Sequence, residues 1–128
     1  MTVIVTMLAL LAGITPAAAR PLTPQDLVTL RRLSSPAVSP DGQTAVYALR
    51  ETDLAADRGR FDLFIVELGR PGAEPVRLLP GPNTNEIDPA FGPDGRIWFL
   101  SDRSGSTQLW HVSVAGGRPV QATRLPRD

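Results

Sequence analysis

Short apolar runs separated by turn-forming residues fill the chain after residue 35. Residues 63–66 (Leu-Phe-Ile-Val) and 97–100 (Ile-Trp-Phe-Leu) are apolar without a break. A strand with one wet face alternates apolar and polar residues, so unbroken runs predict strands that are covered on both faces. Proline, glycine, aspartate and asparagine cluster between the runs. This pattern favours an all-β architecture.

The pattern repeats along the chain. Residues 36–43 (Pro-Ala-Val-Ser-Pro-Asp-Gly-Gln) correspond to residues 89–96 (Pro-Ala-Phe-Gly-Pro-Asp-Gly-Arg), an offset of 53. After one deletion, residues 45–48 match 97–100; further along, residues 62–68 match 108–114 and residues 75–77 match 119–121. Each unit therefore offers four strands, and repetition on this scale predicts a propeller or a solenoid.

Strands that are covered on both faces favour a propeller over a β-sandwich. Propeller blades have four strands and stack face to face, which covers their middle strands on both sides. The units exceed the roughly 40–45 residues of the best-known propeller repeat, and we assign the surplus to polar loops at residues 51–60 and 80–88. We predict an all-β partial β-propeller of about two four-stranded antiparallel blades, at residues 36–80 and 81–128.

The turn residues support this interpretation. In the segment Ser39-Pro40-Asp41-Gly42 the proline presets the second position of a type I turn, and Gly42 can adopt the left-handed conformation that closes a hairpin. Residues 93–95 (Pro-Asp-Gly) repeat the motif in the second unit. We therefore expect a hairpin between the first two strands of each blade.

One short helix is predicted ahead of the blades, over residues 21–33. Thr23 can cap it, Pro24 suits the first helical position, and Asp26 lies where a carboxylate meets unpaired amides. Arg31 and Arg32 fall near its negative end. The expected apolar face, packed on another element, consists of Leu27, Leu30 and Leu33.

The first 19 residues have the pattern of an export signal. Residues 3–14 are uncharged and mostly apolar, too short a run to span a bilayer, and Ala17, Ala18 and Ala19 supply the small residues that signal peptidase needs. We expect cleavage before Arg20, a helix and linker at residues 20–35, and a periplasmic or secreted protein with no membrane span after cleavage. No lysine or arginine precedes the apolar run, so a buried N-terminal strand or helix is the alternative.

Composition narrows the possible chemistry. The chain has no cysteine, which leaves neither disulfides nor thiolate metal sites. Its 13 basic residues, all arginine, balance 13 acidic residues spread along the chain. Because no basic stripe exists to follow phosphates, we expect no nucleic-acid partner.

A few residues invite a functional interpretation, and each also has a structural one. His111, the single histidine, lies inside a strand, where packing is favoured over binding or catalysis. Trp98 and Trp110 can form a ligand platform or pack between blades, and we favour packing. Asp102 and Arg103 can clamp a substrate or stabilise a turn, and we favour the turn. One histidine without cysteines offers no metal site. We therefore predict no catalytic, cofactor-binding or metal-binding residues, and no cofactor.

The repeat carries a family resemblance. Residues 39–42 and 99–110 (Phe-Leu-Ser-Asp-Arg-Ser-Gly-Ser-Thr-Gln-Leu-Trp) resemble the WD40-like (PD40) propeller repeats of TolB-like periplasmic proteins and of prolyl oligopeptidase family (S9) serine peptidases. Residues 22–27, 36–42, 50–53 and 62–64 are similar to the start of an exported S9 dipeptidyl aminopeptidase or acylaminoacyl peptidase. The chain departs from the repeat at Phe91, Gly92 and Ala122, where tryptophan, serine and leucine are usual.

The resemblance implies a propeller that gates peptide access to an α/β-hydrolase domain. The expected partners are downstream blades, that hydrolase domain and peptides. An S9 enzyme needs a serine, typically within Gly-x-Ser-x-Gly, and this motif is absent from the sequence. We therefore predict that the chain alone has no peptidase activity. The alternatives are a non-catalytic TolB-like periplasmic propeller that mediates protein–protein interaction and, least favoured, a stand-alone small β domain, because two blades cannot close a ring.

Overall fold

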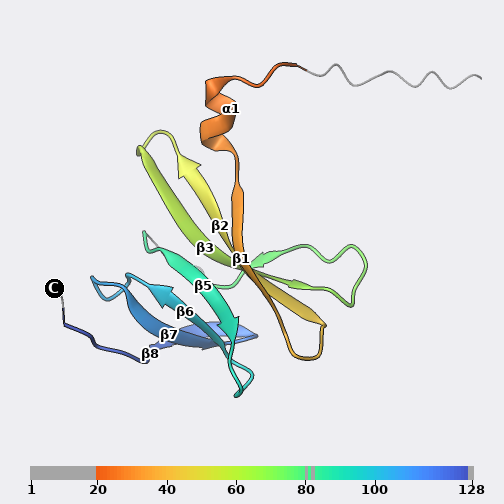
Figure 1. Cartoon of the computed structure of the whole chain (residues 1–128), viewed down its shortest axis with the longest axis vertical. Coiled ribbons are helices and arrows are strands. Elements are labelled where there is room, and N and C mark those ends of the chain that lie inside the picture. Colours follow the sequence, from red (N-terminus) through yellow and green to blue (C-terminus); the bar gives the residue numbers. More distant parts are fainter. Residues whose placement is uncertain (1–19, 80, 82, 127–128) are drawn as a thin grey trace, which may run out of the picture.

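A computed structural model describes residues 20–79, 81 and 83–126. The predicted export signal at residues 1–19 lies outside the described residues. A short helix precedes two antiparallel sheets (Figure 1). The elements are α1 (Pro24–Thr29), β1 (Arg32–Val38), β2 (Thr44–Asp53), β3 (Arg58–Glu67), β4 (Val76–Arg77), β5 (Glu86–Phe91), β6 (Ile97–Ser101), β7 (Gln108–Ser113) and β8 (Gly116–Gln121).

Each sheet is a meander of four strands in chain order. The first, blade 1, has the order β1-β2-β3-β4, and the second, blade 2, has the order β5-β6-β7-β8. Every neighbouring pair is antiparallel. The two sheets lie side by side, with β1 next to β5 (Figure 1). This arrangement confirms the predicted all-β partial propeller.

The sequence repeat is also a repeat of strand register. Phe64 pairs with Arg77 in blade 1, and Trp110 pairs with Gln121 at the corresponding place in blade 2. The first two strands agree in the same way, because Ala37 faces Val46 and Ala90 faces Trp98. Residues aligned by sequence therefore occupy equivalent positions in the two sheets.

A bulge interrupts the first strand of each blade at the same place. The register shifts between Ser34 and Ala37 in β1 and between Ile87 and Ala90 in β5. Ser35 and Asp88, which are 53 residues apart, both have positive φ, 48° and 51°. The Ser35 hydroxyl donates to Asp88 Oδ1 at 2.7 Å. The two bulges thus form a direct bond between the blades.

The predicted hairpins are present in both blades. Gly42 has φ 72° and its amide donates to the Ser39 carbonyl at 2.8 Å, while Gly95 has φ 73° and its amide donates to the Gly92 carbonyl at 3.0 Å. Gly92 stands where the repeat usually has serine. A Cβ at this position would collide with the Trp98 indole, so the tryptophan explains the departure.

The core lies between the blades. Both blades contribute aliphatic side chains, and blade 2 adds the ring of Phe99. These buried residues are Val46, Ala48 and Leu63 of blade 1 and Ile97, Phe99 and Val112 of blade 2. Leu78 and Leu79, which follow β4, complete the core. Because side chains alternate along a strand, the intervening residues point to the opposite faces, where Tyr47, Phe64, Trp98 and Leu100 are half-buried and Asp62 is buried.

The predicted helix is wrong in its length. α1 spans six residues and ends at Thr29, because Leu30 takes an extended conformation and Arg32 and Leu33 pair with β2. β1 thus begins inside the segment expected to be helix and linker. None of the helix residues is buried, and Leu27 is 52% exposed. The expected packing of an apolar helix face is therefore wrong as well.

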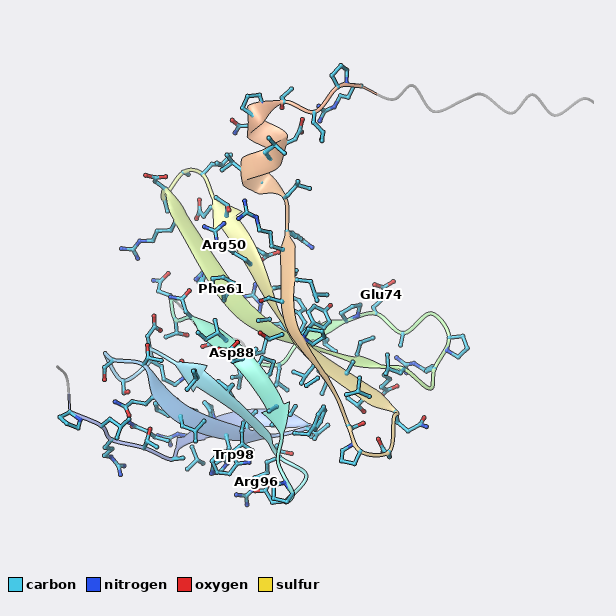
Figure 2. The ribbon with its side chains drawn as sticks, viewed as in Figure 1. Arg50, Phe61, Glu74, Asp88, Arg96 and Trp98 are labelled. Atoms are coloured by element: carbon cyan, nitrogen blue, oxygen red, sulfur yellow. The ribbon has the colours of Figure 1, made fainter. Side chains whose placement is uncertain are left out.

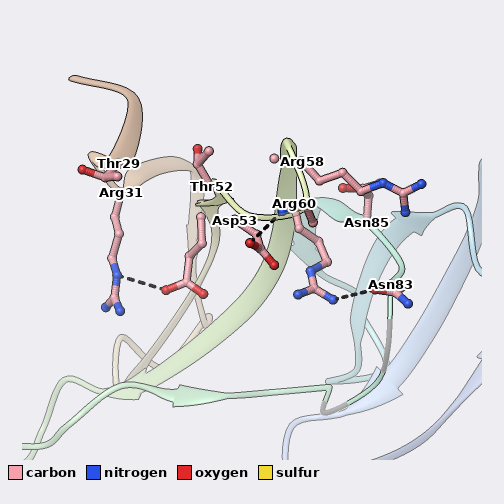
Figure 3. A pocket seen from close by; sticks show the side chains of 11 residues that line it. Thr29, Arg31, Thr52, Asp53, Arg58, Arg60, Asn83 and Asn85 are labelled. Atoms are coloured by element: carbon pink, nitrogen blue, oxygen red, sulfur yellow. Dashed lines mark hydrogen bonds and ion pairs between the residues drawn. The ribbon is translucent and has the colours of Figure 1, made fainter. Parts of the chain in front are cut away.

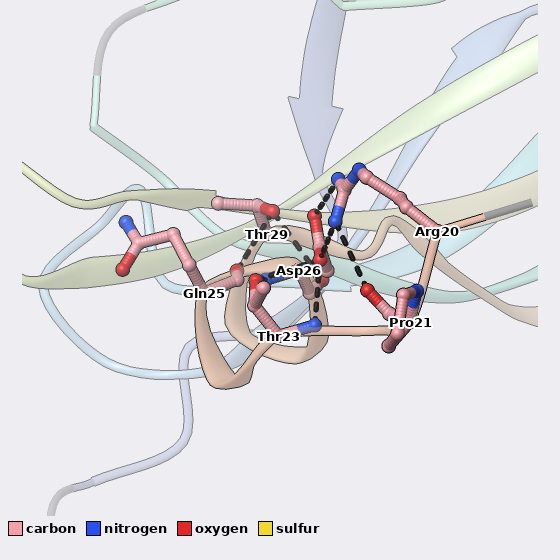
Figure 4. A network of polar contacts seen from close by, with 6 residues as sticks. All are labelled: Arg20, Pro21, Thr23, Gln25, Asp26 and Thr29. Carbon is pink, nitrogen blue, oxygen red and sulfur yellow. Dashed lines mark hydrogen bonds and ion pairs between the residues drawn. The ribbon is translucent and has the colours of Figure 1, made fainter.

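The predicted N-terminus of the helix is confirmed. Thr23 caps α1, and Asp26 completes a capping box by accepting from the Thr23 amide at 2.7 Å (Figure 4). Arg20 holds the same carboxylate through two bonds of 2.6 Å. The Arg20 guanidinium, followed by the bonds from Thr23, lowers the pKa of Asp26 well below its usual range.

Two predicted loops are partly strand. Residues 51–53 belong to β2 and residues 58–60 to β3, so the ladder continues to the pair Asp53–Arg58 and only a short turn connects the strands. Residues 86–88 likewise belong to β5. Among the described residues, no helix is long and apolar enough to span a membrane.

Candidate functional site

A pocket of about 350 Å³ lies at the end of blade 1 next to α1. The residues after α1, the β2–β3 hairpin and the segment before β5 surround it (Figure 3). Its lining is mostly polar or charged and consists of Thr29, Arg31, Glu51, Thr52, Asp53, Ala56, Arg58, Gly59, Arg60, Asn83 and Asn85. This is the candidate site for a polar ligand.

The hairpin positions the charged side chains of the pocket. Asp53 and Arg58 face each other at the last pair of the β2–β3 ladder. The Asp53 carboxylate accepts from the amides of Ala55 and Ala56 at 3.0 and 3.1 Å. These bonds fix the turn, and Asp57 completes it with a φ of 46°. The main role of the Asp53 side chain is therefore to stabilise the β2–β3 turn.

The pocket carries an excess of positive charge. It contains three arginines against two carboxylates, Glu51 and Asp53. Glu51 is shared by Arg31 at 3.0 Å and Arg77 at 3.4 Å, and Arg60 donates to Asn83 Oδ1 at 3.3 Å. Within the described part of the chain, the Arg58 guanidinium has neither an ion-pair nor a hydrogen-bond partner. The pocket therefore suits a carboxylate, and its lining offers no nucleophile paired with a base.

Asn85 connects this pocket to the contact between the blades. Its side-chain oxygen accepts from the Phe61 amide of β3 at 3.2 Å. Its own amide and its Nδ2 donate to the two Asp102 carboxylate oxygens, both at 2.8 Å. Asp102 lies directly after β6, so one asparagine joins the third strand of blade 1 to a turn of blade 2.

A buried ion pair lies close to this junction. Glu86 is 1% exposed, and Arg103 Nη2 reaches its Oε1 at 2.7 Å, with the Thr84 hydroxyl on the same oxygen at 2.6 Å. The guanidinium lies 5.8 Å from the Phe99 ring centroid and 5.3 Å from that of Trp110. Arg103 therefore pairs the carboxylate and covers two rings of the core.

Blade 1 carries a related arrangement. Arg77 reaches buried Asp62 at 3.2 Å and lies 5.8 Å from the Phe64 ring centroid. Burial raises the pKa of Asp62, and the nearby Arg77 only partly offsets that rise. Burial prevails because the Asp62 side chain is 3% exposed, whereas that of Arg77 is 35% exposed and partly hydrated.

The structure brings the residues that the sequence singled out together in two pairs, Trp98 with His111 and Arg103 with Trp110, and neither pair has the geometry of a catalytic site. His111 pairs with Trp98 across β6 and β7, and their rings are 4.8 Å apart. In the described part of the chain the His111 side chain makes no hydrogen bond, either to a serine or to a carboxylate. Trp98 Nε1 donates to Asp94 at 3.3 Å, and Trp110 Nε1 is buried without a partner among the described residues.

Asp102 and Arg103 are neighbours in sequence but serve different partners, Asn85 and Glu86. Sequence reasoning missed both of these partners, because residues 80–88 have the composition of a loop. The one available signal was the carboxylate of Glu86 next to apolar Ile87, at the start of β5. The described residues contain no group of three or more histidine and carboxylate side chains that could hold a metal ion.

Comparison with known proteins agrees with this architecture. No family model matches the chain. It is 42% identical over 89 residues to dipeptidyl-peptidase 5 of Porphyromonas gingivalis, which covers 69% of this chain and 13% of that protein. It is 30% identical over 107 residues to the peptidase YuxL of Bacillus subtilis, covering 82% of this chain and 16% of that protein. The chain thus spans less than a fifth of these curated relatives.

Solved structures give the same picture. An acylaminoacyl peptidase from Pyrococcus horikoshii aligns with a TM-score of 0.58 at 17% identity, over 78% of this chain and 15% of that one. A puromycin hydrolase aligns with a TM-score of 0.60 at 28% identity, over 73% and 14% of the two chains. A TolB protein from Agrobacterium tumefaciens aligns with a TM-score of 0.57 at 25% identity, over 73% and 31%.

Fold and relatives together define a segment of a β-propeller built from two consecutive blades. More specifically, the chain corresponds to the propeller region of S9-type peptidases, and the resemblance carried by its repeats is confirmed.

Proposed function

We propose that this chain forms the N-terminal part of the propeller of an exported S9-type peptidase of the dipeptidyl or acylaminoacyl type. There the propeller limits which peptides reach an α/β-hydrolase domain. The observation that carries the proposal is the 42% identity to dipeptidyl-peptidase 5. A shared fold does not by itself produce so high an identity. The acylaminoacyl peptidase from Pyrococcus horikoshii has the same fold with only 17% sequence identity to this chain.

The chemistry of the described residues supports a gating role. The described lining residues place no nucleophile beside a base, and the contribution we propose for this pocket is recognition or exclusion. Arg58 offers a guanidinium without a partner among the described residues, next to a 350 Å³ pocket, and a guanidinium binds carboxylates well. A peptide passing this end of blade 1 would meet that positive charge.

A second candidate is a non-catalytic, TolB-like propeller that binds a protein partner. The likeness to the Agrobacterium tumefaciens TolB structure supports it, since this likeness covers a larger share of that chain than of the peptidases. The two candidates differ in the sequence expected after residue 128: a hydrolase domain, or further repeats only.

The first test is the DNA beyond codon 128. A continuous reading frame with more repeats and then Gly-x-Ser-x-Gly, an acid and a histidine supports the peptidase. Repeats to the end of the frame support the TolB-like alternative, and a stop codon after Asp128 contradicts gating by this chain.

The second test is enzymatic and uses the full reading frame. We expect cleavage of fluorogenic dipeptidyl or N-acyl-aminoacyl amides, with long peptides excluded. Replacing the serine of Gly-x-Ser-x-Gly by alanine is the matched control. The 128-residue chain alone should not hydrolyse either substrate. Hydrolysis by the chain alone, lost when one of its own serines is replaced, would contradict the proposal.

Export is the third part of the proposal and can be tested separately. We expect the protein in the periplasm or the medium, with Arg20 as the first residue found by N-terminal sequencing. Retention of Met1 in cytoplasmic material would contradict export.

A further inference from the structure

The β2–β3 hairpin of blade 1 is longer than the equivalent hairpin of blade 2. The β6–β7 ladder ends at the pair Ser101–Gln108, which corresponds to Leu49–Asp62 in blade 1. The β2–β3 ladder continues beyond that level through the pairs Arg50–Phe61, Glu51–Arg60, Thr52–Gly59 and Asp53–Arg58. We call residues 50–61 the hairpin extension. It lies at the end of blade 1 that is nearer α1, where Arg50 is found (Figure 2).

One face of the hairpin extension lies beyond the end of blade 2. Side chains alternate along a strand, so Arg50 and Thr52 lie on the same face of β2 as Val46 and Ala48, which pack against blade 2. The β6–β7 ladder does not reach the level of Arg50, so this face is open although its neighbouring blade is present. A further blade would stack on the opposite face of blade 1 or on the far side of blade 2, and it would not cover this face.

A pocket of about 280 Å³ lies at the hairpin extension. Its lining includes three arginines, Arg32, Arg50 and Arg58, and a single carboxylate, Asp57. We call it the arginine pocket. It shares Arg58 with the larger pocket described above, whereas Arg32 and Arg50 do not line that larger pocket. Positive charge is therefore concentrated here, in a chain whose net charge is zero.

The three guanidiniums of the arginine pocket have no carboxylate partner among the described residues. Arg50 Nη1 donates to the Thr52 hydroxyl at 3.2 Å, and within the described part of the chain this is the one hydrogen bond that the three guanidiniums make. Arg32 and Arg50 also face each other directly on β1 and β2. Like charges placed opposite each other on neighbouring strands destabilise a sheet. A bound anion would remove this repulsion.

Gly59 makes room for the Arg50 head group. It faces Thr52 from β3, and a Cβ at residue 59 would collide with the Arg50 guanidinium. Glycine weakens the interior of a strand, and one reason for its presence there is the close approach of another group. The arginine pocket is thus a shaped site, because a larger residue at position 59 would displace one of its three guanidiniums.

We infer that the arginine pocket binds the carboxylate of a peptide, from either its C-terminus or an acidic side chain. A guanidinium presents its N–H groups in a fork that matches the two oxygens of a carboxylate. Arg32 and Arg58 supply two such forks that have no partner among the described residues. The inference rests on the proposed function, because that function brings peptides to the propeller. Arg32, Arg50 and Arg58 are the binding residues, and Gly59 is a positioning residue.

The first experiment measures peptide binding by calorimetry and uses the protein of the full reading frame. Where that frame encodes Gly-x-Ser-x-Gly, its serine is replaced by alanine so that the peptide stays intact. Three N-acetylated, otherwise uncharged peptides are compared: one with a free C-terminus, one amidated, and one amidated with a single internal glutamate. At least one of the two carboxylate peptides should bind about ten times more tightly than the amidated peptide. Equal binding of all three would overturn the inference.

Substitutions locate the binding site. Arg32→Gln and Arg58→Gln should each weaken binding of the carboxylate peptide by about five- to ten-fold and leave the amidated peptide unaffected. Arg118→Gln is the matched control, because Arg118 is exposed on β8 and also has no partner among the described residues. An equal loss in Arg118→Gln would show that overall charge governs binding. That result would overturn the inference, and so would unchanged binding in both Arg32→Gln and Arg58→Gln.

Gly59→Ala tests the geometry of the site without changing its charge. The added methyl group should displace the Arg50 guanidinium and weaken binding as much as Arg50→Gln does. Gly59 is not among the residues with positive φ, so its backbone accepts alanine, and an unchanged melting temperature verifies that the fold is intact. Full binding by Gly59→Ala together with Arg50→Gln would contradict the role assigned to Arg50.

An activity assay separates failure of this inference from failure of the proposed function. An uncharged fluorogenic dipeptidyl amide has no carboxylate for the arginine pocket, so its cleavage by the unmodified protein reports the proposed function alone. If the protein cleaves this substrate but binds the three peptides equally, the inference is wrong and the proposed function stands. If it binds carboxylate peptides through the arginine pocket but cleaves neither this substrate nor an N-acyl-aminoacyl amide, the proposed function is wrong and the binding site stands.

Discussion

Replacing Arg103 by methionine tests the buried ion pair between the blades. The Glu86 side chain is 2% exposed and that of Arg103 19%. Without the guanidinium, the carboxylate keeps only the Thr84 hydroxyl among the partners that the structure describes. Methionine retains an unbranched apolar stem over Phe99 and Trp110, so the substitution removes mainly charge.

The expected loss of stability is large. Removing one partner of a buried pair costs about 3–5 kcal/mol, because the other charge stays buried and unpaired. The partial exposure of Arg103 places the loss near the lower end, about 3 kcal/mol. Domains are stable by only about 5–15 kcal/mol, and each kcal/mol moves the melting temperature by roughly 4 °C at a size between the 60–100-residue and 150–250-residue ranges. We therefore expect a melting temperature lower by about 12 °C.

The assay is urea unfolding followed by tryptophan fluorescence at one low protein concentration. Arg96→Met is the matched control, since Arg96 pairs with Asp94 at 3.7 Å on the surface and should contribute less than about 0.5 kcal/mol. Adding Glu86→Gln to Arg103→Met should restore most of the lost stability. The reasoning is refuted if Arg103→Met costs less than about 1 kcal/mol, or if the double variant is no more stable than the single one.

Three smaller perturbations test other parts of the structure. Thr23→Ala removes the cap of α1 and should speed amide exchange at Leu30 without moving the unfolding midpoint, because no helix residue is buried; a lower midpoint would contradict this. Asp62→Asn tests the raised pKa of Asp62, which means that the folded state binds the carboxyl proton more readily than the unfolded state does. The wild-type chain therefore has its full stability below the unfolded pKa of about 3.9, and it loses part of that stability as the pH rises through the folded-state pKa of Asp62. The variant should therefore gain more stability relative to wild type at pH 7 than at pH 3, and an equal difference at both would refute the shift. Asn85→Ala should cost about 1–3 kcal/mol by leaving the Phe61 amide without its acceptor; unchanged exchange at that amide would show that the bond does not matter.

The blades were predictable because their information is local. The turns at residues 39–42 and 92–95 fix the first hairpin of blade 1 and of blade 2, and the repeat carries the register from residues 62–68 to 108–114. Turn type and alternation specify which residues face each other, so aligning the repeats was enough to place four strands per blade. The glycine at position 92 could not be explained from the local sequence. The structure explains it, because a side chain at this position would collide with the Trp98 indole.

The polar contacts of Asn85 with Asp102 and of Glu86 with Arg103 were not predictable, because the partners are distant in sequence. Asn85 and Glu86 stand in a segment with the composition of a loop, and their partners Asp102 and Arg103 come 17 residues later. The predicted length of helix α1 was wrong for a related reason. Its propensity continues past Thr29, but pairing of Arg32 with Arg50 stabilises an extended backbone there. Tertiary pairing overrides local propensity at such positions.

The internal contact also determines what kind of β architecture this is. Blade 1 buries the face that contains Val46 and Ala48, whereas blade 2 buries the face that contains Phe99 and Trp110. In terms of the repeat these are opposite faces, because Tyr47 of blade 1 is the equivalent of Phe99. Two sheets that met through the same face would leave two identical faces outward, and the stack would have no direction. Sheets that meet through opposite faces always leave one of each kind, so the stacking has a direction and another blade can be added at either end. This polarity, rather than the number of strands, is what makes the pair of sheets a propeller segment.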